Sequence, residues 1–228
     1  MRSKDQLNSC NTDLKDFTID FILPEMAEIN MSKASQYKTL MDKVLKGTNH
    51  LQNRGVTSEP LDFNIQQREF IEASMATDAC EEVIRTLDFH SSCQQAGIDD
   101  GRRYWCFMYR GKIIGLTGYH YRLWDHPDIV WAAWFVAAPQ VSAMTKLGMI
   151  YNNMYVCLTQ TRFREMYIEL LGDGTDSNIY RIFKALGLEE VATFRHFHGQ
   201  NKDMVVMRID LTALRAFSKE EYDLDTIC

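Results

Sequence analysis

The stretch that most constrains the fold of this chain runs from Trp134 to Asn153 and reads WFVAAPQVSAMTKLGMIYNN. It continues an apolar run that begins at Ile129 and ends at Pro139. This run has eleven residues, fewer than the ~18 that a membrane-spanning helix needs, so it predicts a buried strand. After the turn at Ala138-Pro139, apolar residues at helical spacing predict a helix over about 142–159. The backbone NH groups at the start of such a helix can bind an anion.

Strand and helix patterns alternate along the rest of the chain. The predicted strands cover 17–23, 104–109, 113–121, 129–138, 165–171, 190–197 and 203–211. The predicted helices cover 25–46, 66–96, 142–159 and about 176–186, and residues 48–65 are predicted to be a loop. No repeat and no linker divides this order of elements. It predicts an α/β fold with one mixed sheet of about six or seven strands and about four helices on its faces.

Glycines and capping residues predict where the helices end. A break near 76–78 divides the second helical region, because Thr77 or Asp78 can act as an N-cap. Glycine is favoured directly after a helix, so three glycines are expected to end helices: Gly47, Gly97 and Gly187. We expect a polar lead-in over 1–16, a single domain over 17–212 and a polar, weakly ordered tail over 213–228.

Composition excludes several classes of protein. The 228 residues carry a formal net charge of -6, so broad binding to the phosphate backbone of a nucleic acid is not expected. The six cysteines have neither zinc-finger nor C-x-x-C spacing, which favours reduced thiols in a cytoplasmic protein. The polar start has no apolar core typical of a signal peptide. His196 and His198 share a strand face, but no third ligand is near in the sequence, so no metal site is expected.

The order of elements over about 17–212 resembles the GNAT superfamily of N-acetyltransferases. In that superfamily a central strand is followed by Q/R-x-x-G-x-G/A at the start of a helix, where backbone NH groups bind the pyrophosphate of coenzyme A. Here Ser142 takes the basic or glutamine position, with Gln140 as an alternative register, and Ala143 and Thr145 take the glycine positions. Because Ala and Thr lack the conformational freedom of glycine, the loop is a degenerate form of the motif. Hydroxyl groups and the ammonium of Lys146 would add donors to phosphate.

A second stretch, DSNIYRIFKALGL over 176–188, is similar to the superfamily's N-x-x-A-x-x-L-Y-x-K-L-G-F helix. The usual asparagine falls on Asp176, with Asn178 two residues away. The usual tyrosine, which protonates the leaving thiolate, falls on Phe183, which cannot donate a proton. Tyr180, one turn earlier, is the candidate replacement. A hairpin that turns at Arg110-Gly111-Lys112 also resembles the superfamily's second and third strands.

The resemblance implies a three-layer GNAT-like fold and acetyl-CoA or another acyl-CoA as co-substrate. A backbone NH near 134–137 would polarise the thioester carbonyl. The residues that would contact the coenzyme are Phe135, Val136, Ala137, Val141, Ser142, Ala143, Met144, Thr145, Lys146, Asn178 and Phe183. Lys146 has an equally good alternative as a solvated helix lysine.

Four side chains are candidates for the base that deprotonates the acceptor amine. Glu169 lies in an apolar strand, where burial would raise the pKa of its carboxyl, but the strand's polar face is the alternative. His120 lies late in its strand and is either a base or a structural histidine. Asp128 and His126 fit turn positions better. The aromatic residues that line an acceptor pocket or pack in the core are Trp124, Trp131, Trp134 and Tyr151.

These residues favour an N-acyltransferase that moves an acyl group from a thioester to an amine by direct attack. The acceptor is a small molecule or a peptide amine. One alternative is an inactive binding or scaffold protein with this fold, which the lost glycines and tyrosine support. Another is an N-acyltransferase that takes its acyl group from an acyl carrier protein, since a weak nucleotide site then matters less.

Overall fold

A computed structural model describes residues 33–122, 124–172, 178–197, 199–200 and 202–222 of the chain. The chain divides into two units, 1–30 and 31–228, and all of the described residues belong to the second. The strand predicted over 17–23 and the start of the helix predicted over 25–46 lie outside the described residues.

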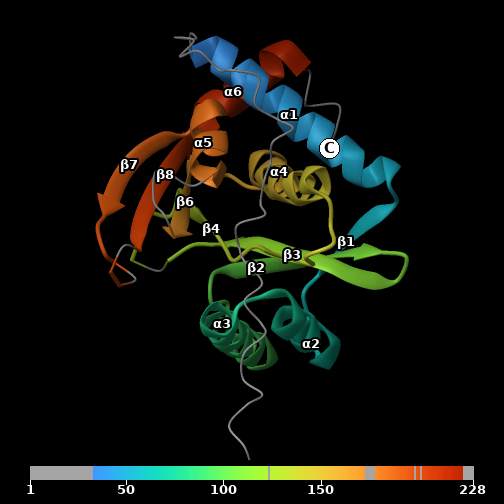
Figure 1. Cartoon of the computed structure of the whole chain (residues 1–228). Coiled ribbons are helices and arrows are strands. Elements are labelled where there is room, and N and C mark those ends of the chain that lie inside the picture. The colour runs from blue at the N-terminus through green and yellow to red at the C-terminus, as the bar shows by residue number, and fades with distance from the viewer. Residues whose placement is uncertain (1–32, 123, 173–177, 198, 201, 223–228) are drawn as a thin grey trace, which may run out of the picture. The chain divides into compact units, whose positions relative to one another are not determined.

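The described residues of the 31–228 unit form one mixed sheet of eight strands with helices around it (Figure 1). The strand order is β1-β2-β3-β4-β6-β8-β7, and β5 pairs separately with β3. The pair β4–β6 is parallel, and all the others are antiparallel. The strands are β1 Val56–Pro60, β2 Arg102–Tyr109, β3 Lys112–His120, β4 Ile129–Ala132, β5 Val136–Ala137, β6 Glu165–Gly172, β7 Glu189–Phe194 and β8 Asp203–Asp210.

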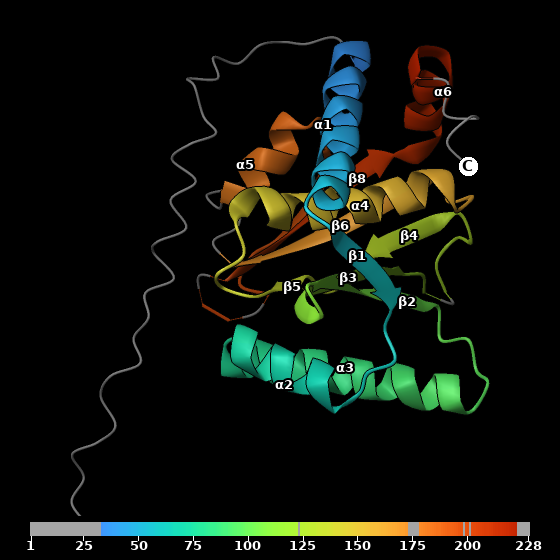
Figure 2. The same ribbon diagram turned by 90° about the vertical axis from the view of Figure 1, so that its right-hand side faces the viewer.

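Helices cover both faces of the sheet, as the mixed sequence pattern predicts. Figure 2 shows α2 and α3 beneath β2 and β3, and α1 and α4 above them. The helices are α1 Lys33–Asn53, α2 Ile65–Ser74, α3 Thr77–Gln95, α4 Ala143–Thr159, α5 Asn178–Ala185 and α6 Leu211–Tyr222. This arrangement confirms the predicted fold class.

The first described helix differs from its prediction. Gly47 does not end it, because α1 continues to Asn53 and Gly47 is buried inside it. A Cβ on Gly47 would lie 2.6 Å from Cδ2 of Tyr151 on α4, so this position needs glycine for helix packing and not for a helix end. The loop predicted over 48–65 is also wrong in part, since it contains the end of α1 and the edge strand Val56–Pro60. That strand has one buried residue, Val56, and therefore lacks an alternating apolar pattern.

The predicted hairpin and helix break are both confirmed. Arg110 and Gly111 have φ of 50° and 72°, as a two-residue turn between β2 and β3 requires. The chain leaves helical conformation between α2 and α3, but the N-cap of α3 is Ala76, without a side-chain hydrogen bond. Both expected N-caps lie one or two residues inside the helix. Gly97, with φ of 69°, follows α3 as predicted.

The strand predicted over 129–138 is two strands. β4 ends at Ala132, and residues 133–135 are neither helix nor strand before β5 begins at Val136. The apolar pattern is continuous here because the three intervening residues pack on both sides of the sheet. Trp134 and Ala133 pack on the core between the sheet and α2–α3, whereas Phe135 packs on the cluster next to α1 and α4.

The end of the described chain is helical, unlike the tail predicted from 213. Leu211, Leu214 and Ser218 of α6 are buried. Arg215 of α6 donates hydrogen bonds to four carbonyl oxygens at and beyond the end of α4: Cys157, Leu158, Thr161 and Phe163. Most of the surface of this helix is polar and only a narrow stripe of it is buried, so the sequence pattern predicted a polar, weakly ordered tail.

Candidate functional site

The strand β4 pairs with β6 only at the beginning of β6. Three pairs join them, ending with Trp131 opposite Tyr167. Beyond this point β6 remains paired with β8 up to Gly172. The segment that follows β4 remains bonded to β3 instead, because the NH of Ala133 donates to Gly118 O at 2.9 Å. The two strands therefore diverge after the third pair. The backbone NH groups of Trp134 and Phe135, on the diverging segment, have no hydrogen-bond acceptor in the described part of the chain.

The chain continues from this segment through β5 and a turn to the start of α4. Ser142 is the N-cap, and its Oγ accepts from the NH of Thr145 at 3.3 Å. The NH groups of Ala143 and Met144 have no acceptor among the residues that the structure describes. No residue of 138–146 has a positive φ, so this turn does not require glycine at the positions of Ala143 and Thr145. The helix start keeps two NH groups that can bind an anion.

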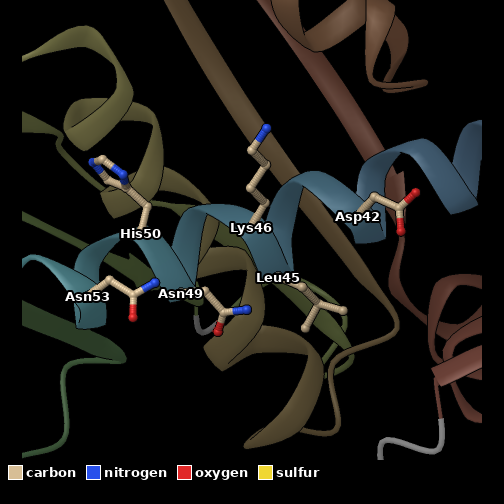
Figure 3. Close-up of a pocket in the computed structure, with 6 residues that line it drawn as sticks. All are labelled: Asp42, Leu45, Lys46, Asn49, His50 and Asn53. Atoms are coloured by element: carbon tan, nitrogen blue, oxygen red, sulfur yellow. The ribbon is translucent and has the colours of Figure 1, made fainter.

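A histidine that the sequence analysis missed also contacts the start of α4. Nε2 of His50, near the end of α1, lies 3.2 Å from Oγ1 of Thr145. His50 also lines a hollow of about 470 Å³ along α1 together with Asp42, Leu45, Lys46, Asn49 and Asn53 (Figure 3). No local pattern could have indicated this residue, since it reaches the site only through the packing of α1 on α4.

The other predicted coenzyme residues on this segment point in different directions. Phe135 and Val141 pack on the cluster next to α1 and α4, whereas Val136 is buried in the core next to α2 and α3. Ala137 pairs with Gly115 in the sheet. Nζ of Lys146 donates to Pro139 O at 3.4 Å, which folds the lysine back over the turn. Burial lowers the pKa of the Lys146 ammonium.

Asn153 of α4 carries an unusual polar atom close to the divergence. Its Nδ2 donates to Gly118 O at 2.7 Å, the same carbonyl that accepts from Ala133. Its Oδ1 is buried and has no hydrogen-bond partner within the described residues, and Asn153 is 4% exposed. A buried carbonyl oxygen without a donor is costly, so a donor from a ligand or a water fits this position.

The three site residues predicted on α5 differ in burial and in their contacts. Asn178 is the first residue of the helix and is exposed, and Phe183 is 3% exposed. The Tyr180 hydroxyl donates to Glu190 Oε2 of β7 at 2.6 Å. That carboxylate, together with burial, raises the pKa of Tyr180 to about 12. The phenol is therefore protonated at neutral pH but is engaged with Glu190.

The candidate bases Glu169 and His120 lie on the same face of the sheet. The face follows from strand alternation and pairing, because Tyr167 pairs with Trp131 and Trp131 with His120. The side chain of Glu169 is not buried as the sequence suggested; it is 34% exposed and accepts from Nη2 of Arg122 at 2.8 Å. Burial, with the nearby charge of Arg122, lowers the pKa of His120 to about 4. His120 is therefore uncharged at neutral pH.

Aromatic and acidic side chains lie beside Arg122, the partner of Glu169. The rings of Trp131 and Tyr167 lie 5.0 Å apart at 31°, and the Arg122 guanidinium lies 4.0 Å from the centre of the Trp131 ring. Nε1 of Trp131 donates to Asp125 Oδ2 at 2.6 Å. Of the aromatic residues predicted to line a pocket, Trp131 is on this face, Trp124 is 81% exposed and Tyr151 is buried against Gly47.

The remaining candidates have structural roles. Asp128 accepts the backbone NH groups of Arg164 and Glu165 with its carbonyl oxygen, and its carboxylate lies 3.6 Å from Nδ1 of His126. Within the described residues, no group of three His, Cys, Asp or Glu side chains could hold a metal ion, and His198 lies outside them. No helix among these residues is both long and apolar enough to cross a membrane. The described cysteines, Cys80, Cys93, Cys106 and Cys157, are buried and unpaired.

Several solved structures are similar to this chain in fold, although their sequence identity with it is low. A GNAT-family protein from Desulfovibrio desulfuricans is 15% identical, with a TM-score of 0.55 over 68% of this chain and 99% of that one. A chimera of the spermidine N-acetyltransferase SpeG from Vibrio cholerae and hSSAT is 13% identical, with a TM-score of 0.53 over 70% of this chain and 97% of that one. A protein classed as an acetyltransferase from Staphylococcus epidermidis is 8% identical, with a TM-score of 0.54 over 68% and 98%.

These similarities show that the chain has the fold of the GNAT superfamily of N-acetyltransferases. The resemblance inferred from the order of elements is confirmed at the level of fold. No protein-family model matches the sequence, and no curated protein matches it either.

Proposed function

We propose that this protein is an acyl-CoA-dependent N-acyltransferase, with acetyl-CoA as the first donor to test. The observation that carries the proposal is the divergence of β4 and β6 after three pairs, followed along the chain by β5 and by the NH groups at the start of α4 that have no acceptor within the described residues. This arrangement offers an anion site and a place for an extended thioester arm within one continuous segment of chain.

The residues present fit the proposed coenzyme. The NH groups of Ala143 and Met144 and the hydroxyl groups of Ser142 and Thr145 would bind its phosphates. Asn153 lies ten residues beyond Ala143, so it is about 15 Å further along α4, on the way from the phosphates to the divergence. Its unpartnered Oδ1 would accept an amide NH of the pantetheine arm. Asn178, Phe183 and Lys146 remain proposed contacts on the flanks.

The chemistry follows from the groups around the divergence. The nitrogen of the acceptor amine attacks the thioester carbonyl carbon, and the new C–N bond forms as its proton passes to Glu169. The NH of Phe135 or Trp134 would stabilise the negative oxygen of the tetrahedral intermediate. The C–S bond then breaks, and the thiolate takes a proton from Tyr180 or from solvent. His120, whose imidazole is uncharged at neutral pH, is the alternative base.

Calorimetric titration with acetyl-CoA tests the proposal directly. We expect saturable binding and a rise in melting temperature that grows with ligand concentration, since a ligand that binds only the folded state stabilises it. Dephospho-CoA and free acetate are the controls, because neither combines the full phosphate charge with the acyl arm. Failure of every acyl-CoA to bind or to stabilise the protein would reject it.

A binding or scaffold protein is the second candidate, and two contacts favour it. Ser142 already caps the helix start that would hold the pyrophosphate, and Tyr180 already donates to Glu190. Under this candidate acetyl-CoA would not shift the melting temperature. Stabilisation by an acyl carrier protein thioester but not by acyl-CoA would instead indicate the carrier-protein alternative.

A further inference from the structure

The guanidinium of Arg122 occupies a position built for a cation. Arg122 follows the end of β3, and its side chain extends across β4 to Glu169 on β6. Its charged group lies 4.0 Å from the centre of the Trp131 ring and 2.8 Å from Glu169 Oε1. An aromatic face and a carboxylate are the two partners that stabilise a cation best in water-accessible sites.

The surroundings of this cation position are acidic once Arg122 is set aside. Asp125 accepts from Nε1 of Trp131 at 2.6 Å, which fixes the ring and places a second carboxylate beside it. Tyr167 stacks on Trp131 and extends the aromatic surface. His120 pairs with Trp131 across β3 and β4, and its imidazole is uncharged at neutral pH. Two other arginines of the described residues share this face, Arg102 opposite His120 and Arg208 opposite Tyr167. Each is paired with carboxylates of its own, Arg102 with Asp100 and Arg208 with Glu165 and Glu189. Glu169 and Asp125 therefore leave a site that favours a cation.

The cation position also lies at the divergence of the two strands. Tyr167 and Trp131 form the last pair of β4 and β6, and Glu169 is the next residue of β6 on the same face. An amine nitrogen held beside Glu169 would therefore be next to the place proposed for the thioester. The side chains of Arg122 and Glu169 are 30% and 34% exposed, so a ligand can reach them from solvent.

We propose that the ammonium group of the acceptor replaces the Arg122 guanidinium between Trp131 and Glu169. Arg122 presents its charge at the end of an unbranched methylene chain. The acceptor of matching chemistry is a primary ammonium at the end of an unbranched methylene chain, and not an amine flanked by a carbonyl or a carboxylate. The role of this ammonium group as the acceptor rests on the proposed function. Binding of a cation at this site does not require coenzyme A.

The test removes the internal cation and adds an external one. In Arg122→Met, which keeps the methylene stem, we expect n-butylammonium to bind roughly three- to thirtyfold more tightly than in the wild type. Arg110→Met is the matched control, because Arg110 also stacks on an aromatic ring, that of Tyr109, at 5.1 Å. Adding Glu169→Gln to Arg122→Met should abolish the gain. Equal affinity in the wild type and Arg122→Met would overturn the proposal.

A second measurement uses the wild type, so that a folding defect in the variant cannot hide the answer. The indole NH resonance of Trp131, assigned with Trp131→Phe, should shift with n-butylammonium and not with n-butanol or butyrate. A shift with butyrate alone would mean that Arg122 binds a carboxylate, which contradicts the proposal. Both measurements omit acetyl-CoA, so loss of the cation site and loss of coenzyme binding are separate results.

Discussion

Gly148 of α4 faces the carbonyl oxygen of Gly47 on α1, and a Cβ on Gly148 would lie 3.1 Å from that oxygen. The same Cβ would lie 3.1 Å from Cδ2 of Leu51. These two glycines let the helices approach closely, and the approach brings His50 of α1 to Thr145 at the start of α4. The geometry of the proposed phosphate site therefore depends on the packing of α4 against α1, whose His50 lies 95 residues before Thr145.

A larger side chain at the contact between α1 and α4 should destabilise the protein. We expect Gly148→Val to lower the free energy of unfolding by about 1–3 kcal/mol, because a backbone oxygen cannot move aside as a side chain can. Asn49→Val, on the exposed side of α1, is the control for the effect of a β-branched residue in a helix. Urea unfolding measures both. A Gly148→Val protein as stable as the control would contradict the close crossing.

Acidification should act on stability through His120. The pKa of His120 is about 4 in the folded protein, below the ordinary value of 6.5, so the unfolded chain binds more protons between these values. Stability is therefore full above about pH 6.5 and falls as the pH drops toward 4, by up to about 1.4 kcal/mol per unit. His120→Gln should flatten this slope in urea melts at different pH, and the exposed His126→Gln should not.

Arg215 should be important for the end of α4. Its four hydrogen bonds to carbonyl oxygens join α6 to α4 and to the segment that leads into β6. We expect Arg215→Met to cost about 2–4 kcal/mol, since buried carbonyls lose a charged donor. Arg162→Met, at an exposed position nearby, should change stability by less than about 0.5 kcal/mol. Equal melting temperatures for the two variants would show that water replaces the guanidinium.

Asn153 should distinguish a ligand contact from a structural one. Asn153→Leu removes the unpartnered Oδ1, while Gly118 O keeps its bond from Ala133. We expect stability within about 1 kcal/mol of the wild type and acetyl-CoA affinity lower by about 5- to 30-fold, the value of one buried hydrogen bond. Unchanged affinity in calorimetry would mean that the oxygen binds water alone.

Lys146 should contribute through charge. Lys146→Ala is expected to weaken acetyl-CoA binding by about 3- to 10-fold at low salt and by less at high salt, because an exposed ion pair is screened. Lys112→Ala, at the exposed start of β3, is the control for net charge. If both variants bind acetyl-CoA like the wild type at low salt, Lys146 has no role at the phosphates.

The sequence determined the elements whose signal is local. The hairpin turn at Arg110-Gly111 and the glycine after α3 follow from backbone preferences of a few neighbouring residues. The order of these elements was sufficient to predict the fold. The turn and the helix of the proposed coenzyme segment were likewise predicted from local pattern.

The tertiary structure decided the features that depend on partners far apart in the chain. Position 47 requires glycine because Tyr151 fills the space beside it, and the edge strand at Val56 exists because β2 pairs with it. Glu169 is an exposed partner of Arg122, which lies 47 residues earlier in the chain. Side-chain environments of this kind arise from packing between elements, and local periodicity contains no information about them.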